Sequence, residues 1–265
     1  MMKAHKVMDD KIPTSLILGS EGFLGRALCR YLEPHEKVIH YDLKLDPAQD
    51  LRSVKLDLTG VDRVYLLAWD VGGAKYIYNP ATQEAQFEWN MKLIANTLPQ
   101  LKGIPFLFVS SQQANLSNAY GVSKRMGEIW SKLLGGVIVR LWNIYGETEP
   151  ESERSHVVSD FVRQAKETGK IKMQTDGTES RQFVHTFDAC QALYLAMTQQ
   201  YKELYDITSY EWVSIRQIAD FISKETGVEI IPGQEAGRNF KTPYVGRMPD
   251  WTRTISLEDG IRDMI

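Results

Sequence analysis

A glycine turn near the start of the chain constrains the fold more than any other feature. An apolar run at residues 15–18 leads into this turn, and a helical pattern follows over residues 23–32. Gly19, Gly22 and Gly25 permit a tight turn and close backbone approach. The N-terminus of the following helix presents unpaired N–H groups and the positive end of its dipole to an anion. The turn therefore predicts a site for the pyrophosphate of a dinucleotide, although its spacing is G-x-x-G-x-x-G and not the common G-x-G-x-x-G.

Strands and helices alternate along the first 145 residues. The expected strands cover residues 15–18, 37–41, 53–56, 63–67, 106–109 and 137–141, and the expected helices cover residues 23–32, 80–101 and 119–134. Continuous apolar strands separated by helices predict a parallel sheet covered on both faces, which is a doubly wound α/β fold.

The regular alternation of strands and helices ends near residue 145, and the polar connections between elements become longer. Short strands are expected near Ile171 and Phe183, and helices at residues 186–198 and 214–226. We therefore expect two parts. Residues 1–145 form a dinucleotide-binding domain, and residues 146–265 form a smaller, partly interleaved lobe that binds the substrate.

Charge and cysteine content argue against several classes of protein. A net charge of −3 gives no reason to expect a surface for nucleic acid. Cys29 and Cys190 fall in predicted helices, so we expect buried thiols. No apolar stretch approaches the roughly 18 residues of a membrane span, and residues 1–11 lack the apolar run of a secretion signal. We expect a cytoplasmic protein with no metal site.

An acidic residue, Asp42, directly follows the second expected strand. A carboxylate at this position can accept hydrogen bonds from the adenosine ribose and would repel a 2′-phosphate, which favours NAD over NADP. The alternative is that Asp42 is an ordinary turn residue. Lys44 nearby weakens the argument, because a cation would tolerate the phosphate.

A tyrosine, a lysine and a serine pair carry the expected chemistry. Tyr120 and Lys124 are four residues apart and share one face of a helix. A phenol with an ordinary pKa of about 10 is a poor acid–base catalyst at neutral pH. The ammonium of Lys124 and a cationic nicotinamide ring would lower that pKa, and Lys124 can also bond to the nicotinamide ribose. Ser110 and Ser111 end the preceding strand, where a hydroxyl can orient a reacting oxygen; loop solvation is the alternative.

The glycine turn and the Tyr-x-x-x-Lys pair together resemble the short-chain dehydrogenase/reductase superfamily. The resemblance narrows to its extended branch, the NAD-dependent epimerase/dehydratase family, which modifies nucleotide-linked sugars on a Rossmann fold. It runs along nearly the whole chain. The further segments that carry it are residues 57–58, 67–68, 140–146, 181–185 with Asp188, and 205–208.

This resemblance implies roles for individual residues. Strand register against the family makes Ser111 the hydroxyl that completes the catalytic set. Asn143, Arg181 and Arg247 are implied to contact the sugar nucleotide, with forked guanidinium donors on its diphosphate, although the alignment around Arg247 is loose. Asp57 is implied to face the adenine, with helix capping as the alternative. The residues implied to bind NAD are Gly19, Gly22, Phe23, Leu24, Gly25, Asp42, Asp57, Leu58, Leu67, Ala68, Tyr120 and Lys124.

Two details resemble the members of the family that act on GDP-sugars. Gly72 and Gly73 are similar to glycines of GDP-fucose synthase and GDP-mannose 3,5-epimerase, which implies contact with the substrate. His156 lies in a segment similar to one that carries a catalytic histidine in GDP-fucose synthase, and its ordinary pKa suits proton transfer. The alternative for His156 is a helix cap or a hydrogen bond to a ligand.

The departures from the family narrow the expected reaction. The segment between Ser111 and Tyr120 is shorter than usual, which removes one wall of the pocket or opens it. Gln113 stands where the 3,5-epimerases carry a cysteine, and the Thr-Asp-Glu triplet of 4,6-dehydratases is missing. These departures disfavour 3,5-epimerisation and 4,6-dehydration. The reaction that is left is hydride transfer at C4 of a nucleotide-diphosphate sugar, catalysed by an epimerase, a reductase or a dehydrogenase. The alternative class is a non-catalytic NAD-binding sensor or regulatory subunit.

The family also implies a homodimer. Its members often pair two helices from each subunit, which here are residues 80–101 and 119–134. Both helices carry apolar residues on more than one face, and Trp89 or Trp130 is expected to remain for a partner. The alternative is that both tryptophans pack within the monomer.

Overall fold

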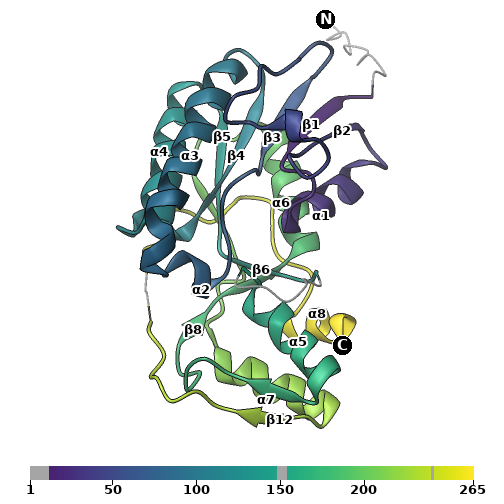
Figure 1. Cartoon of the computed structure of the whole chain (residues 1–265). Coiled ribbons are helices and arrows are strands. Elements are labelled where there is room, and N and C mark those ends of the chain that lie inside the picture. The colour runs from purple at the N-terminus through teal and green to yellow at the C-terminus, as the bar shows by residue number, and fades with distance from the viewer. Residues whose placement is uncertain (1–11, 148–153, 240–241) are drawn as a thin grey trace, which may run out of the picture.

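The computed structural model describes residues 12–147, 154–239 and 242–265. A six-stranded sheet and its helices form one layered unit of this structure, and a smaller lobe lies beside it (Figure 1). The strands pair in parallel in the order β10-β5-β4-β3-β1-β2. Their bounds are β1 Thr14–Leu18, β2 Lys37–Tyr41, β3 Arg63–Leu66, β4 Phe106–Ser111, β5 Val137–Leu141 and β10 Tyr205–Ile207. The expected doubly wound α/β fold is confirmed.

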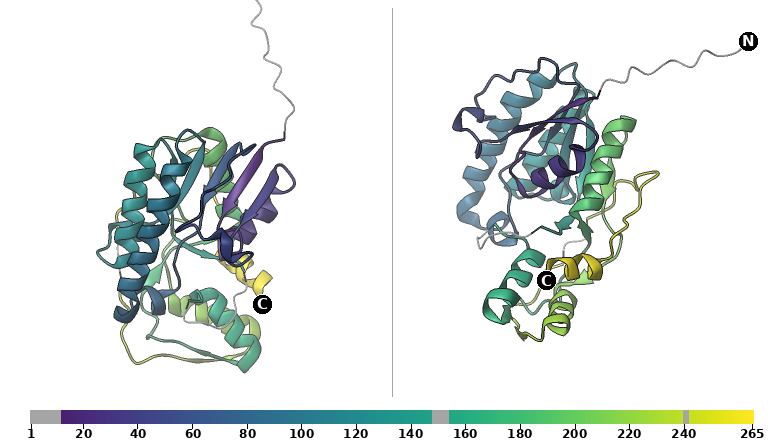
Figure 2. Two further views of the ribbon diagram at one scale, coloured as in Figure 1. Left: turned by 45° about the horizontal axis from the view of Figure 1, so that its top comes forward. Right: turned by 90° about the vertical axis from the view of Figure 1, so that its right-hand side faces the viewer.

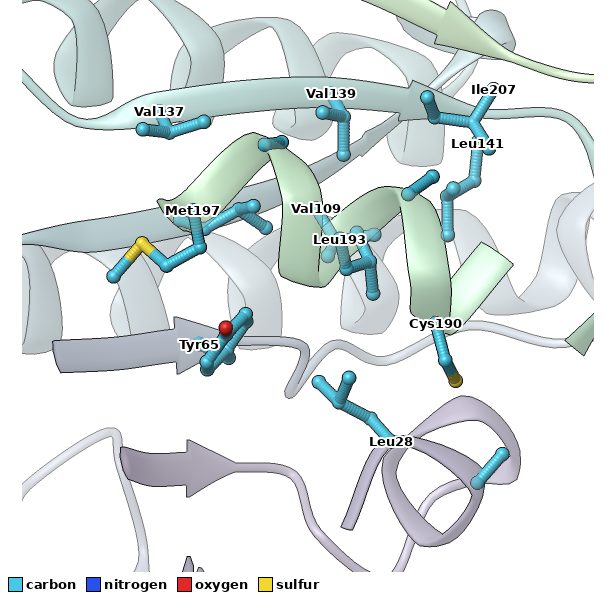
Figure 3. Close-up of a cluster of buried hydrophobic side chains, with 14 of the residues drawn as sticks. Leu28, Tyr65, Val109, Val137, Val139, Leu141, Cys190, Leu193, Met197 and Ile207 are labelled. Atoms are coloured by element: carbon cyan, nitrogen blue, oxygen red, sulfur yellow. The ribbon is translucent and has the colours of Figure 1, made fainter. Parts of the chain in front are cut away.

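Successive residues of the strands enter two separate cores, which explains why the strands are continuous apolar runs. Ile17 and Tyr65 face one pair of helices, α1 and α6 (Figure 3). Leu16 and Leu66 face the other side of the sheet, where α3 and α4 pack together. The bounds of these helices are α1 Phe23–Leu32, α6 Thr186–Gln199, α3 Gln83–Thr97 and α4 Ala119–Leu133.

The smaller lobe lies beside the unit of the large sheet (Figure 2). It has a hydrophobic core of its own, centred on α5 and α7. Phe161, Ile171 and Ile218 are buried in it. Its strands form short two-stranded pairs. The elements are α5 Val157–Thr168, α7 Ile215–Thr226, α8 Leu257–Met264, β6 Asn143–Tyr145, β7 Lys170–Lys172, β8 Ser180–Arg181, β9 Phe183–His185, β11 Val213–Ser214 and β12 Glu229–Ile231.

The chain returns to the large sheet after entering the smaller lobe. Helix α6 packs on β4 and β5, and β10 then adds to the sheet beside β5. The two parts are therefore interleaved in sequence. The boundary at residue 145 stays a prediction.

The strand expected at residues 53–56 is wrong. Side chains of α3 and of the 3-10 turn that follows it, Leu98–Leu101, make the hydrogen bonds that a neighbouring strand would otherwise provide. Asn96 Nδ2 donates to the carbonyl oxygens of Leu51 and Val54, and Leu56 N donates to Gln100 Oε1 at 2.8 Å. The segment is thus held against a helix and does not join the sheet.

The helix expected at residues 80–101 is divided into three parts by its prolines. Pro80 opens a short 3-10 turn, Pro80–Thr82, and α3 follows it. Pro99 cannot donate an α-helical hydrogen bond, so the last turn, Leu98–Leu101, is also 3-10. A short helix before it, α2 Ala74–Ile77, was not expected. Both cysteines are free and buried, as predicted.

Candidate functional site

A cavity of about 1070 Å³ lies between the carboxyl ends of the large sheet's strands and the smaller lobe. This is where ligands bind in open parallel α/β sheets. The cavity brings together most of the residues singled out from the sequence. Those that line it are Gly19, Gly22, Phe23, Leu24, Gly25, Asp42, Leu67, Ala68, Gly72, Gly73, Ser111, Tyr120, Lys124, Asn143, His156 and Arg181.

The glycine turn is packed so tightly that side chains would not fit at two of its positions. Gly19 has a φ of +95°, and a Cβ there would lie 2.5 Å from Ala68 N. A Cβ on Gly25 would lie 2.0 Å from the carbonyl oxygen of Gly19. Gly22, at the N-cap of α1, makes no side-chain capping bond. The first turn of α1 therefore faces the cavity with the backbone geometry that suits a pyrophosphate.

Asp42 faces this turn from the end of β2. Its carboxylate accepts from Glu21 N at 3.0 Å and from Lys44 N at 2.9 Å. The ammonium of Lys44 instead donates to the carbonyl oxygen of Glu21 at 3.1 Å. Asp42 thus orders a turn and also lines the cavity, so both interpretations of this residue have a structural basis.

Asp57 and Leu58, which are expected to face the adenine, are not brought to the cavity. Asp57 is exposed and accepts from Thr59 N at 3.0 Å, and neither residue lines the cavity. A second Asp-Leu dipeptide, Asp50-Leu51, lines it instead. Asp50-Leu51 has the same two residue types as Asp57-Leu58 and lies seven positions before it. The later dipeptide was preferred because residues 53–56 are expected to form a strand that ends beside it.

Asp50 has its own cationic partner in this part of the cavity. Arg52 Nη2 donates to Asp50 at 2.6 Å, and hydrogen bonding from Arg52 lowers the pKa of Asp50. The guanidinium carbon of Arg52 lies 3.4 Å from the centre of the Trp89 ring. The ring of Trp89 therefore contacts a side chain of its own subunit.

Ser111, Tyr120 and Lys124 meet where β4 ends against α4. Tyr120 hydrogen-bonds to Ser111, while burial raises the pKa of Tyr120 to about 12. Lys124 Nζ donates to the carbonyl oxygen of Val109 at 2.7 Å and lies 5.9 Å from the centre of the Tyr120 ring. The expected lowering of the Tyr120 pKa by Lys124 is therefore not seen in this arrangement: burial raises this pKa, and the contribution that opposes burial comes from Ser111.

The environment of Lys124 is largely apolar. Its Nζ lies 4.0 Å from the centre of the Trp69 ring and 5.1 Å from that of Phe108. Burial lowers the pKa of Lys124 well below its ordinary value, and the charge of Glu128 opposes that shift. Trp69 also lines the cavity, and sequence reasoning had assigned it no role.

The short segment between Ser111 and Tyr120 does form a wall of the cavity. Residues Gln112–Asn115 make a 3-10 turn, and both Gln112 and Gln113 line the cavity. Tyr78 donates its hydroxyl hydrogen to Gln113 Oε1 at 3.2 Å, and Thr242 donates to Gln112 Oε1 at 2.8 Å. Two glutamines and their hydrogen-bond partners thus line this side of the cavity.

His156 lies over the glycine turn. Its ring centre is 5.1 Å from that of Phe23, and the residue precedes α5 without a side-chain capping bond. Gly73 N donates to Arg154 O at 2.9 Å, and a Cβ on Gly73 would lie 2.3 Å from Ser155 O. The glycine at position 73 is thus required by the close approach of the segment that leads into His156.

The arginines of the site differ from those expected. Arg181 lines the cavity, and its guanidinium donates to the carbonyl oxygens of Ser180 at 2.8 Å and Arg238 at 3.0 Å. Arg247 does not line the cavity, because its guanidinium stacks 4.2 Å from the centre of the Tyr210 ring. Arg238, nine positions earlier, lines the cavity and had not been singled out.

A buried amide supports the wall that follows β3. Asn90 is fully buried, accepts from Asp70 N at 2.8 Å and donates to Asp70 O at 3.1 Å. Gln86, one helical turn earlier, donates to the same carbonyl oxygen. Gln86 and Asn90 are polar residues among the buried positions of a helix. In the sequence, that pattern was the signal that these side chains support a neighbouring segment.

The described residues include no metal-binding cluster and no helix that could span a membrane. Among them, no three His, Cys, Asp or Glu side chains gather closely enough to hold a metal ion. None of the helices in these ranges is both long and apolar enough to cross a membrane. Residues 1–11, on which the expectation about a secretion signal rests, lie outside the described ranges.

Part of the chain matches a known protein family, and curated relatives cover more of its length. Residues 99–208 match the model of the NAD dependent epimerase/dehydratase family. GDP-mannose 3,5-epimerase 1 of Oryza sativa subsp. japonica is 25% identical over 301 residues, covering 93% of this chain and 79% of that protein. A putative UDP-glucose 4-epimerase of Methanocaldococcus jannaschii is 29% identical over 57% of this chain and 53% of that protein.

Solved structures share the fold. An epimerase from Methanothermobacter thermautotrophicus superposes with a TM-score of 0.79 at 17% identity, over 96% of this chain and 91% of that chain. The UDP-N-acetylglucosamine 4-epimerase of Methanobrevibacter ruminantium M1 gives 0.78 at 17% identity, over 96% and 97%. The family's cofactor is NAD, as its description states. Residues 99–208 of the chain thus match the NAD dependent epimerase/dehydratase family, and most of its length is similar to a GDP-mannose 3,5-epimerase.

Proposed function

We propose that this protein is an enzyme that uses NAD to move a hydride at C4 of a nucleotide-diphosphate sugar. One observation carries the proposal. The glycine turn and the Ser111–Tyr120–Lys124 group line the same cavity, and that cavity continues to the arginines of the smaller lobe. These residues would provide a cofactor site, an acid–base group and a polyanion site within one cavity.

The residues around the turn fit NAD. The backbones at Gly19 and Gly25 leave no space for side chains, so main-chain N–H groups would hold the pyrophosphate. Asp42 would accept from the adenosine ribose and repel a 2′-phosphate, which favours NAD over NADP. Lys124 would donate to the nicotinamide ribose. The bound cofactor supplies the acceptor and donor of the hydride.

The chain's own residues would handle the proton. Tyr120 takes the proton from the sugar hydroxyl as the carbon is oxidised and returns it on reduction. Ser111, which hydrogen-bonds to Tyr120, steadies the same oxygen. The raised pKa of Tyr120 favours the neutral phenol, so the charge of Lys124 and of the bound cofactor would have to counter the effect of burial.

The smaller lobe would hold the nucleotide. Arg181 and Arg238 line this part of the cavity, and forked guanidinium donors pair well with diphosphate oxygens. Asn143 lines the cavity nearby, and its Nδ2 donates to Gln182 O at 2.9 Å. The similarity to a GDP-mannose 3,5-epimerase supports a GDP-sugar, as do Gly72 and Gly73. His156, over the glycine turn, is proposed as a second proton-transfer group.

The experiment is a screen of GDP-, UDP- and dTDP-sugars with mass detection of the products. Fluorescence of copurified NADH provides a first readout, because only true substrates should bleach or restore it. A C4 epimer or C4 ketone of one nucleotide sugar is expected. Bound NAD with no turnover of any sugar would instead favour the non-catalytic alternative, which the comparisons do not support.

We also propose a homodimer that pairs α3 and α4 of each subunit. Exposed apolar side chains lie on these helices: Phe87, Met126, Ile129 and Leu133 are 38%, 40%, 50% and 80% exposed. A twofold contact would cover them. Light scattering at micromolar concentration should give a mass of about twice 30.3 kDa. A mass of a single chain would contradict the proposal. A cytoplasmic location is proposed with it, and the free thiols of Cys29 and Cys190 are compatible with that.

A further inference from the structure

A buried carboxylate lies one helical turn beyond Lys124. Glu128, on α4, is 8% exposed. Its Oε1 accepts from Ser110 Oγ at 2.5 Å and from Arg140 Nε at 2.6 Å, and its Oε2 accepts from Arg140 Nη2 at 2.8 Å. Ser110 and Arg140 are also buried, so the three side chains form a charged group enclosed by the protein.

This group joins the elements that carry the proposed chemistry. Ser110 lies directly before Ser111 on β4. Arg140 is the residue opposite Ser110 on β5. Glu128 lies on the same helix as Tyr120 and Lys124. Its carboxylate therefore ties α4 to both strands beside the point where Ser111 meets Tyr120.

Stability alone does not explain such a group. Removing two charges from water costs much of what their attraction returns, so a buried ion pair is weak evidence for stabilisation. Its geometric effect is clear, however, because three hydrogen bonds of fixed direction set how α4 sits on the sheet. The charge of Glu128 also opposes the effect of burial on the pKa of Lys124.

We propose that Glu128 is a positioning residue for the Tyr120–Lys124 pair. Its buried carboxylate holds α4 against β4 and β5. This contact keeps the amine of Lys124 where it can donate a hydrogen bond to the nicotinamide ribose. The inference rests on the proposed function, which places the nicotinamide end of NAD beside Lys124.

The chain offers a matched control at the opposite end of the same sheet. Glu36 is 5% exposed, accepts from Ser15 Oγ and pairs with Arg63 Nη1 at 3.0 Å. Ser15 and Arg63 are opposite each other on β1 and β3, as Ser110 and Arg140 are on β4 and β5. None of Ser15, Glu36 and Arg63 lines the cavity. The two groups share chemistry and burial but differ in their distance from the site.

The test compares Glu128→Gln with Glu36→Gln in the full chain. Both changes replace a buried carboxylate with a neutral group of the same shape, and urea denaturation measures the stability that each loses. Dissociation constants are then measured for NAD+ and for ADP, which lacks the nicotinamide ribose. Lys124→Ala shows how much the amine contributes to the NAD+ affinity.

Glu128→Gln should weaken NAD+ binding at least about tenfold and leave ADP binding within roughly twofold. Glu36→Gln should leave the ratio of the two constants unchanged at a similar loss of stability. A wild-type ratio in Glu128→Gln overturns the positioning role. If Glu128→Gln does not fold, the ratio is measured for Glu128→Asp, which keeps the charge on a shorter side chain, and a wild-type ratio there overturns it equally. If Lys124→Ala keeps the wild-type ratio of the NAD+ and ADP dissociation constants, Lys124 does not contact the nicotinamide ribose. The proposed function would then fail together with this inference.

Discussion

Tyr120→Phe should abolish hydride transfer while the protein still binds NAD. The change removes one hydroxyl from a buried side chain and keeps the ring, so the packing of α4 on β4 is preserved. Proton transfer by a positioned side chain contributes a factor on the order of 10²–10⁴ to rate, and the phenol is the group that hydrogen-bonds to Ser111. The measurement is the reduction of bound NAD by the substrate that the screen identifies, beside an NAD titration.

Tyr78→Phe is the matched control for this prediction. Tyr78 also lines the cavity, but its hydroxyl donates to the amide of Gln113 and not to the serine of the site. Its removal should change the rate far less than the removal of the Tyr120 hydroxyl. Near-normal hydride transfer in Tyr120→Phe would eliminate the proposed acid–base role, and equal losses in both variants would show that phenols in this cavity act through packing.

Local chemistry at the start of the chain was sufficient to predict half of the fold. The glycine turn, the strand before it and α1 are close in sequence, so each supports the interpretation of the others. Strand β10 was not predicted as a strand because it has three residues, too few for a periodic pattern. Its place in the sheet depends on pairing with β5, which lies far away in the sequence.

The candidate site shows the same division between local and distant information. The spacing of Tyr120 and Lys124 is a local feature, whereas Ser111 was chosen over Ser110 by strand register against the family that the chain resembles; all three line the cavity. Arg238 was not predictable, because its place in the cavity depends on how a long polar connection folds back. Arg247 looked equally suitable in the sequence, but it stacks on Tyr210. Which arginine of this region lines the cavity thus required the structure.

Gly25→Ala should destroy the cofactor site. The added Cβ would lie 2.0 Å from Gly19 O and 2.9 Å from Gly19 C, which are backbone atoms that no side-chain rotation can move aside. The turn must therefore open. We expect NAD affinity to fall on the order of 100-fold, about 2.7 kcal/mol, and the free energy of unfolding to fall by about 1–3 kcal/mol. Titration with NAD and urea denaturation measure the two effects.

Gly22→Ala separates this geometry from the general loss of a glycine. Gly22 lines the same cavity, has an extended backbone with φ of −74°, and would place a Cβ 3.3 Å from Gly19 O. An alanine fits there after a shift of a few tenths of an ångström, so NAD binding should be nearly retained. The two variants differ only in which glycine of the turn gains a methyl group. If they lose NAD affinity equally, the close approach of Gly19 to α1 is not what forms the site, and cofactor binding depends instead on contacts that both glycines share.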